Sequence, residues 1–322
     1  MEELQSTGLL TDKQMETFRK LKETFATKLG QTTKGEVLKG YNIIPNFSVE
    51  TTEYAYEKWS PREGDVFLVT FPKTGTHWVH EIVRQILYQD EEIYKLSKLL
   101  PAFLELPLPP CEVFDFLDEL PLTRRILSTH MPAELINVEK LKHVNAKVIY
   151  VLRNPKDAIV SWYHFMQSLP ADMVKDRQHM HSSGWDKYFE HVISGDYPMN
   201  SKPGEWYPEH ILEWYKHKDY KNIRFLRYED LKKDLQKEVL NLADFLEAPV
   251  SSETAETIAH KCTFDNMKEA LSEEHAITKH INMRKGAVGG WKNFFTVAQS
   301  EQVDDIMREK LAATDIQFIY KI

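Results

Sequence analysis

The chain has 322 residues, of which 42% are hydrophobic and 28% are charged, and its formal net charge at pH 7 is -8. This composition is typical of a soluble globular protein, and the negative charge disfavours a general nucleic-acid binder. The two cysteines, Cys111 and Cys262, lie far apart in the sequence, so they indicate no disulfide framework and fit a reducing compartment.

The N-terminal residues, MEELQSTGLLTDKQ, include acidic side chains and lack the apolar core of a signal peptide. No run of about 18 apolar residues occurs, so the sequence predicts no membrane span. We therefore expect a cytoplasmic protein that binds neither membranes nor nucleic acid. Thr11 to Gln14 match a capping box, which predicts a helix to about Leu29. We expect residues 1–36 to form a peripheral helical arm of one domain that spans residues 1–322.

Two segments are rich in residues that interrupt regular structure. Residues 36–64 contain Pro45, Pro61 and Gly64, so we predict that they are irregular. Residues 98–123 contain five prolines, which argue against a long helix or a central strand. An apolar loop stiffened by prolines suits the wall of a substrate pocket, and a packed surface loop is the alternative.

Short apolar segments alternate with helical patterns along the chain. We predict strands over residues 65–71, 125–129, 147–152 and 223–228. We predict helices over residues 79–88, from the third strand to about residue 167, and from the fourth to about residue 245. This order indicates an α/β fold with a central, mainly parallel sheet and helices on both faces. Ligands bind at the carboxyl ends of such strands, where Lys73, His130, Arg153 and Tyr228 fall.

The segment from Thr70 to Trp78, TFPKTGTHW, carries the most informative pattern. A strand enters it and an amphipathic helix leaves it, which predicts a strand–loop–helix unit like a phosphate-binding P-loop. Gly75 lets the backbone approach an anion, the helix N-terminus offers free N–H groups, and Lys73 adds a positive charge. The lysine precedes the glycine, so the segment does not fit the GxxxxGKS/T pattern of ordinary ATPases.

Two further segments place cations where an anion can bind. Arg153 and Ser161 are eight residues apart, one after a strand and one in the next helix, so together they can bind a phosphate. Arg284 and Lys285 lie beside Gly286 and form another candidate anion site. Each cation taken alone is better explained by a solvated surface. Three basic loops in an acidic protein, however, favour one ligand with several phosphates.

Single aromatic and histidine residues have more than one interpretation. Trp78 can stack on a purine or belong to the core. His130 ends a strand and is a candidate general base, because histidine titrates near neutral pH. His179 and His181 have no matching third metal ligand, so we interpret them as part of an exposed loop and expect no metal site.

Three ordered motifs resemble those of the cytosolic sulfotransferases, and the resemblance extends from about residue 38 to about residue 315. The phosphosulfate loop of that family is similar to residues 71–78, its 3′-phosphate motif to residues 148–161, and its C-terminal loop to residues 284–293. The resemblance implies a sulfotransferase whose donor is 3′-phosphoadenosine-5′-phosphosulfate (PAPS), with the phosphoadenosine PAP as product. The implied acceptor is a small phenol, steroid, alcohol or amine, and the implied chemistry requires no metal.

The resemblance also implies roles for single residues. His130 matches the catalytic base, and Lys73 matches the contact of the 5′-phosphate and the bridging oxygen. The other implied donor-site residues are Thr74, Gly75, Thr76 and His77 at the 5′-phosphate, Trp78, Phe264 and Tyr228 at the adenine, and Arg153, Ser161, Arg284, Lys285 and Gly286 at the 3′-phosphate. Phe103 and Phe165 match acceptor-pocket positions. Lys292, Thr296, Val297 and Glu301 match a short dimerisation motif, which implies a homodimer.

Four residues depart from the pattern of that family. His77 replaces a threonine, and an imidazolium there can take over a phosphate contact, which would make donor affinity depend on pH. Ser128 stands where many phenol-acting members carry lysine and some steroid- and alcohol-acting members carry serine. Gly290 replaces an aspartate and is expected to loosen the C-terminal loop. Cys262 replaces a hydroxyl residue near the adenine and removes one hydrogen bond.

Two other functions are kept as alternatives. A nucleotide kinase is disfavoured, because the GKS/T sequence is missing and no pair of magnesium-binding carboxylates is evident. A phosphoadenosine-binding protein with weak or lost catalysis would account for the four departures. Lys73 and His130 are both retained, so we expect an active enzyme.

Overall fold

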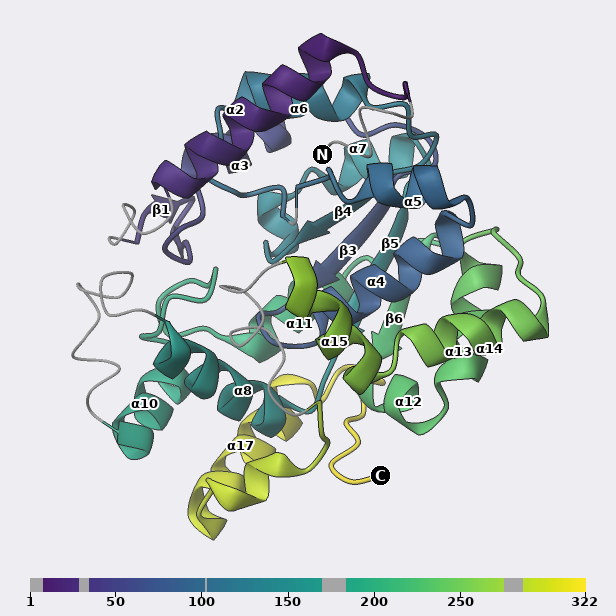
Figure 1. Cartoon of the computed structure of the whole chain (residues 1–322). Coiled ribbons are helices and arrows are strands. Elements are labelled where there is room, and N and C mark those ends of the chain that lie inside the picture. Colours follow the sequence, from purple (N-terminus) through teal and green to yellow (C-terminus); the bar gives the residue numbers. More distant parts are fainter. Residues whose placement is uncertain (1–7, 29–34, 102, 170–183, 275–285) are drawn as a thin grey trace.

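A computed structural model describes residues 8–28, 35–101, 103–169, 184–274 and 286–322, with the backbone alone for residues 270–274. A four-stranded sheet lies at the centre and the helices surround it (Figure 1). The strands are β3 Val66–Thr70, β4 Ile126–Thr129, β5 Lys147–Leu152 and β6 Ile223–Arg227. All four differ by at most one residue at either end from the predicted ranges, so the strand predictions are confirmed.

The four strands are parallel and lie in the order β4–β3–β5–β6. Val66 of β3 lies opposite both Ile126 and Lys147, so the strands start level with each other and their carboxyl ends share one edge. Every residue of β3, β4 and β5 is buried. Burial on both faces is the property expected of a parallel sheet that helices cover on each side. The predicted α/β class is confirmed.

Helices and short turns connect and cover the strands. The helices are α2 Asp12–Lys28, α3 Val49–Glu57, α4 Thr76–Leu87, α5 Glu91–Ser97, α6 Pro110–Glu119, α7 Val138–His143, α8 Pro155–Ser168, α10 Gly184–Ile193, α11 Tyr207–Tyr215, α12 Tyr228–Lys233, α13 Leu235–Phe245, α14 Ser252–Lys261, α15 Phe264–Glu274 and α17 Val297–Lys310. The other elements are the 3₁₀ turns η1 Ala133–Leu135 and η3 Gly290–Asn293, and a hairpin of β1 Val37–Leu38 and β2 Tyr41–Asn42.

The two faces of the sheet carry different helices. Helix α4 packs on β3 and β4, and α13 and α14 pack in turn on α4. Helix α11 covers β5 from the other face, where the ring of Tyr150 lies 5.6 Å from that of His210 and 6.4 Å from that of Trp214. This arrangement leaves the carboxyl edge of the sheet open to the loops that carry the candidate site.

The predicted N-terminal helix is confirmed as α2. Thr11 Oγ1 accepts a hydrogen bond from Gln14 N at 3.2 Å, and Gln14 Oε1 accepts one from Thr11 N at 2.8 Å, which completes the capping box. Helix α2 lies alongside α6 at the edge of the molecule (Figure 1), where Phe18 stacks on Phe116 at 5.9 Å. The described part of the arm therefore packs on the outer helix α6.

The prediction that residues 36–64 are irregular is wrong. They form the β1–β2 hairpin and the nine-residue helix α3. Ser48 caps α3, because its side chain accepts a hydrogen bond from Thr51 N at 3.1 Å. Pro45 and Pro61 lie outside α3 on either side, so they bound the helix and do not interrupt it.

Two other expectations need correction. Helix α6 occupies part of the segment predicted as a proline-stiffened loop. Its first residue is Pro110, and proline is tolerated there because the first position of a helix needs no backbone N–H. The single helix predicted to reach residue 245 is two helices, α12 and α13. Asp234 separates them and accepts a hydrogen bond from Lys237 N at 3.1 Å, so it caps the second helix.

Candidate active site

The loop between β3 and α4 turns sharply at Gly75. Gly75 has φ +120° and precedes the first residue of α4, with no side chain capping the helix. A Cβ atom at this position would lie 2.8 Å from the ring of Tyr228. Both the backbone conformation and the close approach of Tyr228 therefore require glycine. Helix α4 begins at Thr76, three residues before the predicted start, so its N-terminus lies directly at the turn.

Lys73 lies just before this turn in a left-handed conformation, with φ +68°. Such a backbone costs energy for a residue with a Cβ atom, and residues of this kind are concentrated at functional sites. The Lys73 ammonium lies 4.4 Å from the centre of the Phe165 ring. The structure thus brings the predicted catalytic lysine against one of the two predicted acceptor-pocket residues.

The threonine hydroxyls of the loop stabilise the loop itself. Thr74 Oγ1 donates to the carbonyl of Phe71 at 2.8 Å, and the hydroxyls of Thr76 and Thr70 are 2.7 Å apart. All of these threonine side chains are buried. Among the described residues, the N-terminus of α4 therefore has neither a side-chain cap nor a loop hydroxyl at its first N–H groups, which is the arrangement that suits a bound anion.

His130 directly follows β4 and is buried. Its Nδ1 lies 2.7 Å from the carbonyl oxygen of Thr70 and 2.9 Å from Thr70 Oγ1. A carbonyl accepts only, so Nδ1 carries the proton and Nε2 keeps a free lone pair. Burial lowers the pKa of His130 to about 3, although the bond to Thr70 opposes that shift. The imidazole is therefore neutral at physiological pH and can accept a proton at Nε2.

Aromatic side chains line the space beside His130. The Phe103 ring lies 4.6 Å from the His130 ring, and the Phe47 ring lies 5.6 Å from Phe103 and 6.0 Å from His130. His77 meets Phe103 edge-on at 6.0 Å. We call Phe47, Phe103 and His77 the aromatic wall. Phe103 was predicted in this place, whereas nothing in the sequence singled out Phe47, which lies in the segment predicted as irregular.

His77 was expected to bind the 5′-phosphate as an imidazolium. The His77 side chain is exposed at the surface. The protein atoms around it partly remove its hydration, and this desolvation lowers the pKa of His77, as do the positive charges of Lys73 and Arg84. The role expected for His77 at the 5′-phosphate stays a prediction. The edge-on contact with Phe103 shows that the His77 ring also borders the aromatic wall.

Arg153 follows β5 and connects three parts of the site. Its Nη1 donates to the carbonyl of Lys73 at 2.7 Å, and its guanidinium lies 4.4 Å from the centre of the Tyr228 ring. Its backbone N–H donates to the Tyr207 hydroxyl at 3.0 Å. The residue is 8% exposed, yet its buried Nε has no hydrogen-bond partner among the described residues. A buried cation with an unused donor suits a phosphate ligand, and Ser161 lies two turns further along α8.

Trp78 and Tyr228 pack against each other, with ring centres 4.9 Å apart and the rings edge-on. Trp78 Nε1 donates to the backbone carbonyl of Cys262 at 2.7 Å, while the Cys262 side chain is fully buried. Cys262 therefore supplies a hydrogen bond through its carbonyl, independently of which side chain it carries. Phe264 begins α15, and Gly286 (φ +56°) approaches it so closely that a Cβ atom would lie 2.3 Å from the ring.

The C-terminal loop is only partly described. Arg284 and Lys285, like His179 and His181, lie outside the described residues. The expectation that Gly290 loosens the loop stays a prediction, and the described part of the loop is held by hydrogen bonds to α8. Asp157 of α8 accepts hydrogen bonds from Gly289 N at 2.8 Å and from Trp291 N at 3.0 Å, so a carboxylate ties down the backbone on both sides of Gly290.

Ser128 does not line the aromatic wall. Its side chain is fully buried, and its hydroxyl lies 2.8 Å from His80 Nδ1, while His80 Nε2 lies 3.0 Å from Arg84 Nη2. Ser128 thus joins β4 to α4. Its hydrogen bond explains a serine at this position without reference to the class of acceptor.

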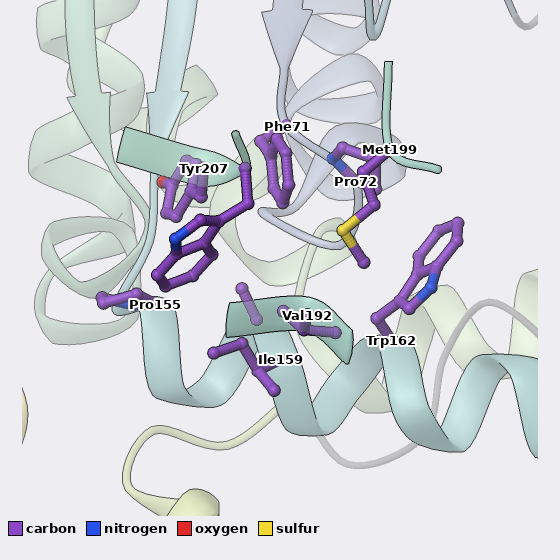
Figure 2. A pocket seen from close by; sticks show the side chains of 10 residues that line it. Phe71, Pro72, Pro155, Ile159, Trp162, Val192, Met199 and Tyr207 are labelled. Atoms are coloured by element: carbon purple, nitrogen blue, oxygen red, sulfur yellow. The ribbon is translucent and has the colours of Figure 1, made fainter. Parts of the chain in front are cut away.

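A small apolar cavity lies behind the phosphate-binding loop, and Figure 2 shows the side chains around it. Its lining includes Phe71, Pro72, Ile159, Trp162, Met199 and Tyr207. The lining contains no charged side chain, so the cavity does not suit a phosphate, and we assign it to the packing of the loop on α8.

The chain thus has a parallel α/β fold with a P-loop-like strand–loop–helix unit, a neutral buried histidine and, among the described residues, an arginine with one unused donor at one sheet edge. The family model described as "Sulfotransferase domain" matches residues 63–315. The chain therefore belongs to the sulfotransferase family, which confirms the predicted resemblance and the predicted class of enzyme.

Curated relatives and a solved structure match most of the chain. Sulfotransferase 1B1 of Canis lupus familiaris is 32% identical over 300 residues, which cover 88% of this chain and 95% of that protein. The amine sulfotransferase of Oryctolagus cuniculus is 34% identical over 277 residues, covering 81% and 85%. The crystal structure of mouse sulfotransferase SULT7A1 complexed with PAP matches with a TM-score of 0.72 and 30% identity, covering 87% and 95%.

Two kinds of structural feature are absent from the described residues. No described helix is both long and apolar enough to cross a membrane. Within the described ranges, no group of three or more histidine, cysteine, aspartate or glutamate side chains is placed to hold a metal ion.

Proposed function

We propose that this protein transfers the sulfuryl group of PAPS to a hydroxyl group of a small, largely apolar acceptor. In this proposal His130 is the general base and Lys73 stabilises the leaving group. The observation that carries the proposal is the fixed tautomer of His130. Nδ1 is bound to the Thr70 carbonyl at 2.7 Å, which leaves the lone pair of Nε2 for a proton.

The residues of the donor side fit a ligand with two separate phosphates. We propose that Gly75 and the start of α4 bind the 5′-phosphate together with Lys73, and that Arg153 and Ser161 bind the 3′-phosphate with Arg284, Lys285 and Gly286. Support comes from the unused Nε of the buried Arg153 and from the glycine turn against Tyr228. The similar mouse protein was crystallised with PAP. We propose that Trp78 and Phe264 hold the adenine.

In this proposal one residue of the chain accepts a proton and another stabilises a developing negative charge. PAPS supplies the sulfuryl group and a phosphate leaving group for an in-line displacement. His130 Nε2 takes the proton of the acceptor hydroxyl, and the Nδ1–H bond to Thr70 stabilises the imidazolium that results. The Lys73 ammonium offsets the negative charge that grows on the leaving oxygen. Each such group typically contributes a factor of ~10² to 10⁴ in rate.

The aromatic wall favours an acceptor with an apolar body. Among the described residues, Glu105 is the carboxylic acid that accepts a hydrogen bond from the His130 backbone N–H. Burial raises the pKa of this carboxyl to about 7. Glu105 is 1% exposed, so it does not offer a surface charge to an ammonium group. We therefore propose a phenol, a steroid or another hydroxyl compound in preference to a cationic amine.

A matched pair of histidine variants tests the proposal. Labelled sulfate is followed from PAPS to a panel of phenols, steroids, alcohols and amines without added magnesium, and PAP binding is measured by calorimetry. We expect His130→Ala to lower kcat by ~10² to 10⁴ while the Kd for PAP stays within about twofold. The exposed His143→Ala serves as the control and should behave as the unchanged protein.

Two results would count against the proposal. Turnover that survives in His130→Ala refutes the base assignment. PAP binding by the unchanged protein without transfer to any acceptor favours the alternative, a phosphoadenosine-binding protein that has lost catalysis.

We also propose that two chains associate through the segment that contains Lys292, Thr296, Val297 and Glu301. All four side chains are exposed, and Val297 is 75% exposed at the start of α17. Val297→Glu should convert a dimer to a monomer in sedimentation velocity without lowering Tm. Val37→Glu, at a valine that is 64% exposed elsewhere, is the control. A monomeric unchanged protein would disprove the association.

A further inference from the structure

Asn200 lies in the connection between α10 and α11, which contains no recognisable motif, yet it joins two parts of the candidate site. Its side chain is buried, at 1% exposure. Asn200 Oδ1 accepts a hydrogen bond from Ile44 N at 2.8 Å, and Asn200 Nδ2 donates one to the carbonyl of His130 at 3.2 Å. One side chain therefore connects the peptide of the proposed base to the segment that leads to Phe47.

The backbone at Asn200 is as specifically placed as its side chain. Its φ of +56° is left-handed, a conformation in which asparagine is several-fold enriched over most other residues. Asn200 N donates to the carbonyl of Asn42 at 3.0 Å, and Asn42 N donates to that of Ser201 at 2.8 Å. These two bonds form an antiparallel bridge that holds the connection against β2.

The peptide groups of His130 are held from three separate segments. Glu105 Oε1 accepts from His130 N at 2.6 Å, and the His130 carbonyl accepts from both Asn200 Nδ2 and His210 Nε2, each at 3.2 Å. The Tyr150 hydroxyl lies 2.8 Å from His210 Nδ1 and can donate to it, which leaves Nε2 as the donor of that ring. The carbonyl of Glu105 accepts from Ser48 N at 2.9 Å, next to Phe47.

We propose that Asn200 is a positioning residue that couples the aromatic wall to His130. It holds the His130 carbonyl and the Ile44 backbone at a fixed separation, so that Nε2 and the ring of Phe47 keep the spacing that an acceptor requires. Asn200 acts through these two groups and does not itself take part in proton transfer. The inference rests on the proposed role of His130 as the base.

Loss of this side chain has a specific physical consequence. The Ile44 N–H is buried, and without Asn200 Oδ1 it loses the hydrogen-bond acceptor that it has among the described residues. The His130 carbonyl keeps His210 but loses its second donor. Both segments can then shift relative to each other, and small displacements of reacting groups reduce rates strongly.

An asparagine-to-glycine exchange tests the inference without disturbing the left-handed backbone. Asn200→Gly removes the side chain and keeps a residue that accepts positive φ. Asn145→Gly is the matched control, because Asn145 has φ +54° and is exposed outside the site. The variants are assayed at mildly alkaline pH with a weakly acidic hydroxyl, such as an aliphatic alcohol, and with para-nitrophenol, which is largely ionised under these conditions.

The two acceptors separate a misplaced base from a general loss of structure. An acceptor that is already ionised does not need His130, whereas a weakly acidic one does. We expect Asn200→Gly to lower kcat/KM at least ~10-fold for the alcohol but less than ~3-fold for para-nitrophenol, with the Kd for PAP within about twofold. Asn145→Gly should leave all three quantities unchanged.

Equal losses on both acceptors, or a parallel loss of PAP binding, would overturn the inference. Asn200→Asp provides a second variant, since it keeps an acceptor for Ile44 N and removes the donor to the His130 carbonyl. Asn200→Asp should also lose more kcat/KM for the alcohol than for para-nitrophenol. Equal losses of kcat/KM for the two acceptors in this variant would likewise overturn the inference. Failure of the proposed function is distinguishable, because His130→Ala would then retain turnover of the alcohol whatever Asn200→Gly does.

Discussion

The donor side and the aromatic wall of the candidate site are assembled in different ways. On the donor side, Lys73 and Arg153 lie in loops that directly follow β3 and β5, within continuous motifs. On the other side, Phe47, Phe103 and Asn200 come from three connections without regular structure. The comparison teaches that the half of the site proposed to bind phosphate is encoded locally, whereas the half proposed to face the acceptor exists only after the chain has folded.

The two sides meet through the two proposed catalytic residues. The Lys73 ammonium lies on the ring of Phe165 at 4.4 Å, and the ring of His130 lies 4.6 Å from that of Phe103. Lys73 and His130 both lie just after strands of the sheet, and each of them contacts a phenylalanine predicted to line the acceptor pocket.

On the donor side, the largest expected effect comes from removing the charge of Lys73. Lys73→Ala should lower kcat by ~10² to 10³, because it removes the positive charge proposed to stabilise the leaving oxygen. Lys39→Ala is a close control, since Lys39 also has a left-handed backbone (φ +50°) and places its ammonium 3.6 Å from the centre of the Tyr56 ring. Steady-state kinetics with saturating PAPS measure the difference. A Lys73→Ala protein that keeps most of its kcat would remove Lys73 from the mechanism.

A smaller effect is expected at the turn of the donor side. Gly75→Ala forces a Cβ atom against Tyr228, so we expect the Kd for PAP to rise ~10-fold and the free energy of unfolding to fall by about 1–3 kcal/mol. Gly40→Ala also has positive φ (+87°) but meets nothing within 4 Å, so it should lose some stability and no affinity for PAP. Calorimetry and urea unfolding provide the two numbers. Equal effects in both variants would show that strain alone, without the contact to Tyr228, explains the glycine.

The smallest expected effect comes from His77→Thr, which tests whether His77 contacts the donor or the acceptor. The His77 ring contacts Phe103 of the aromatic wall, so if His77 serves the acceptor, PAP binding should take up no proton through it between about pH 6 and about pH 8. His77→Thr should therefore leave the pH profile of PAP binding unchanged. It should raise the acceptor KM by about 2- to 10-fold, the equivalent of one edge-on aromatic pair.

Calorimetry in two buffers with different ionisation enthalpies measures the proton uptake. A pH dependence that disappears in His77→Thr would return His77 to the donor side and restore the imidazolium hypothesis.

Predictions from the sequence succeeded where the physical cause is local. The strand β5 was predicted at its observed bounds, because a run of buried apolar residues between polar ends identifies a strand of a parallel sheet. The capping box at Thr11 and the glycine turn at Gly75 were also readable, since both depend on residues within a few positions of each other. Helices α3 and α6 escape prediction for an equally local reason, because a proline before a helix or at its first position does not exclude the helix.

The sequence alone therefore determined the α/β class, the phosphate-binding loop and the candidate base of this sulfotransferase, because periodicity, caps and backbone preferences act over short distances along the chain. Tertiary structure decided which groups surround that base. The hydrogen bond from Asn200 to the His130 carbonyl joins residues that are 70 positions apart, and that from His210 joins residues 80 apart. Contacts of this range depend on the whole path of the chain between them, and no local pattern encodes that path.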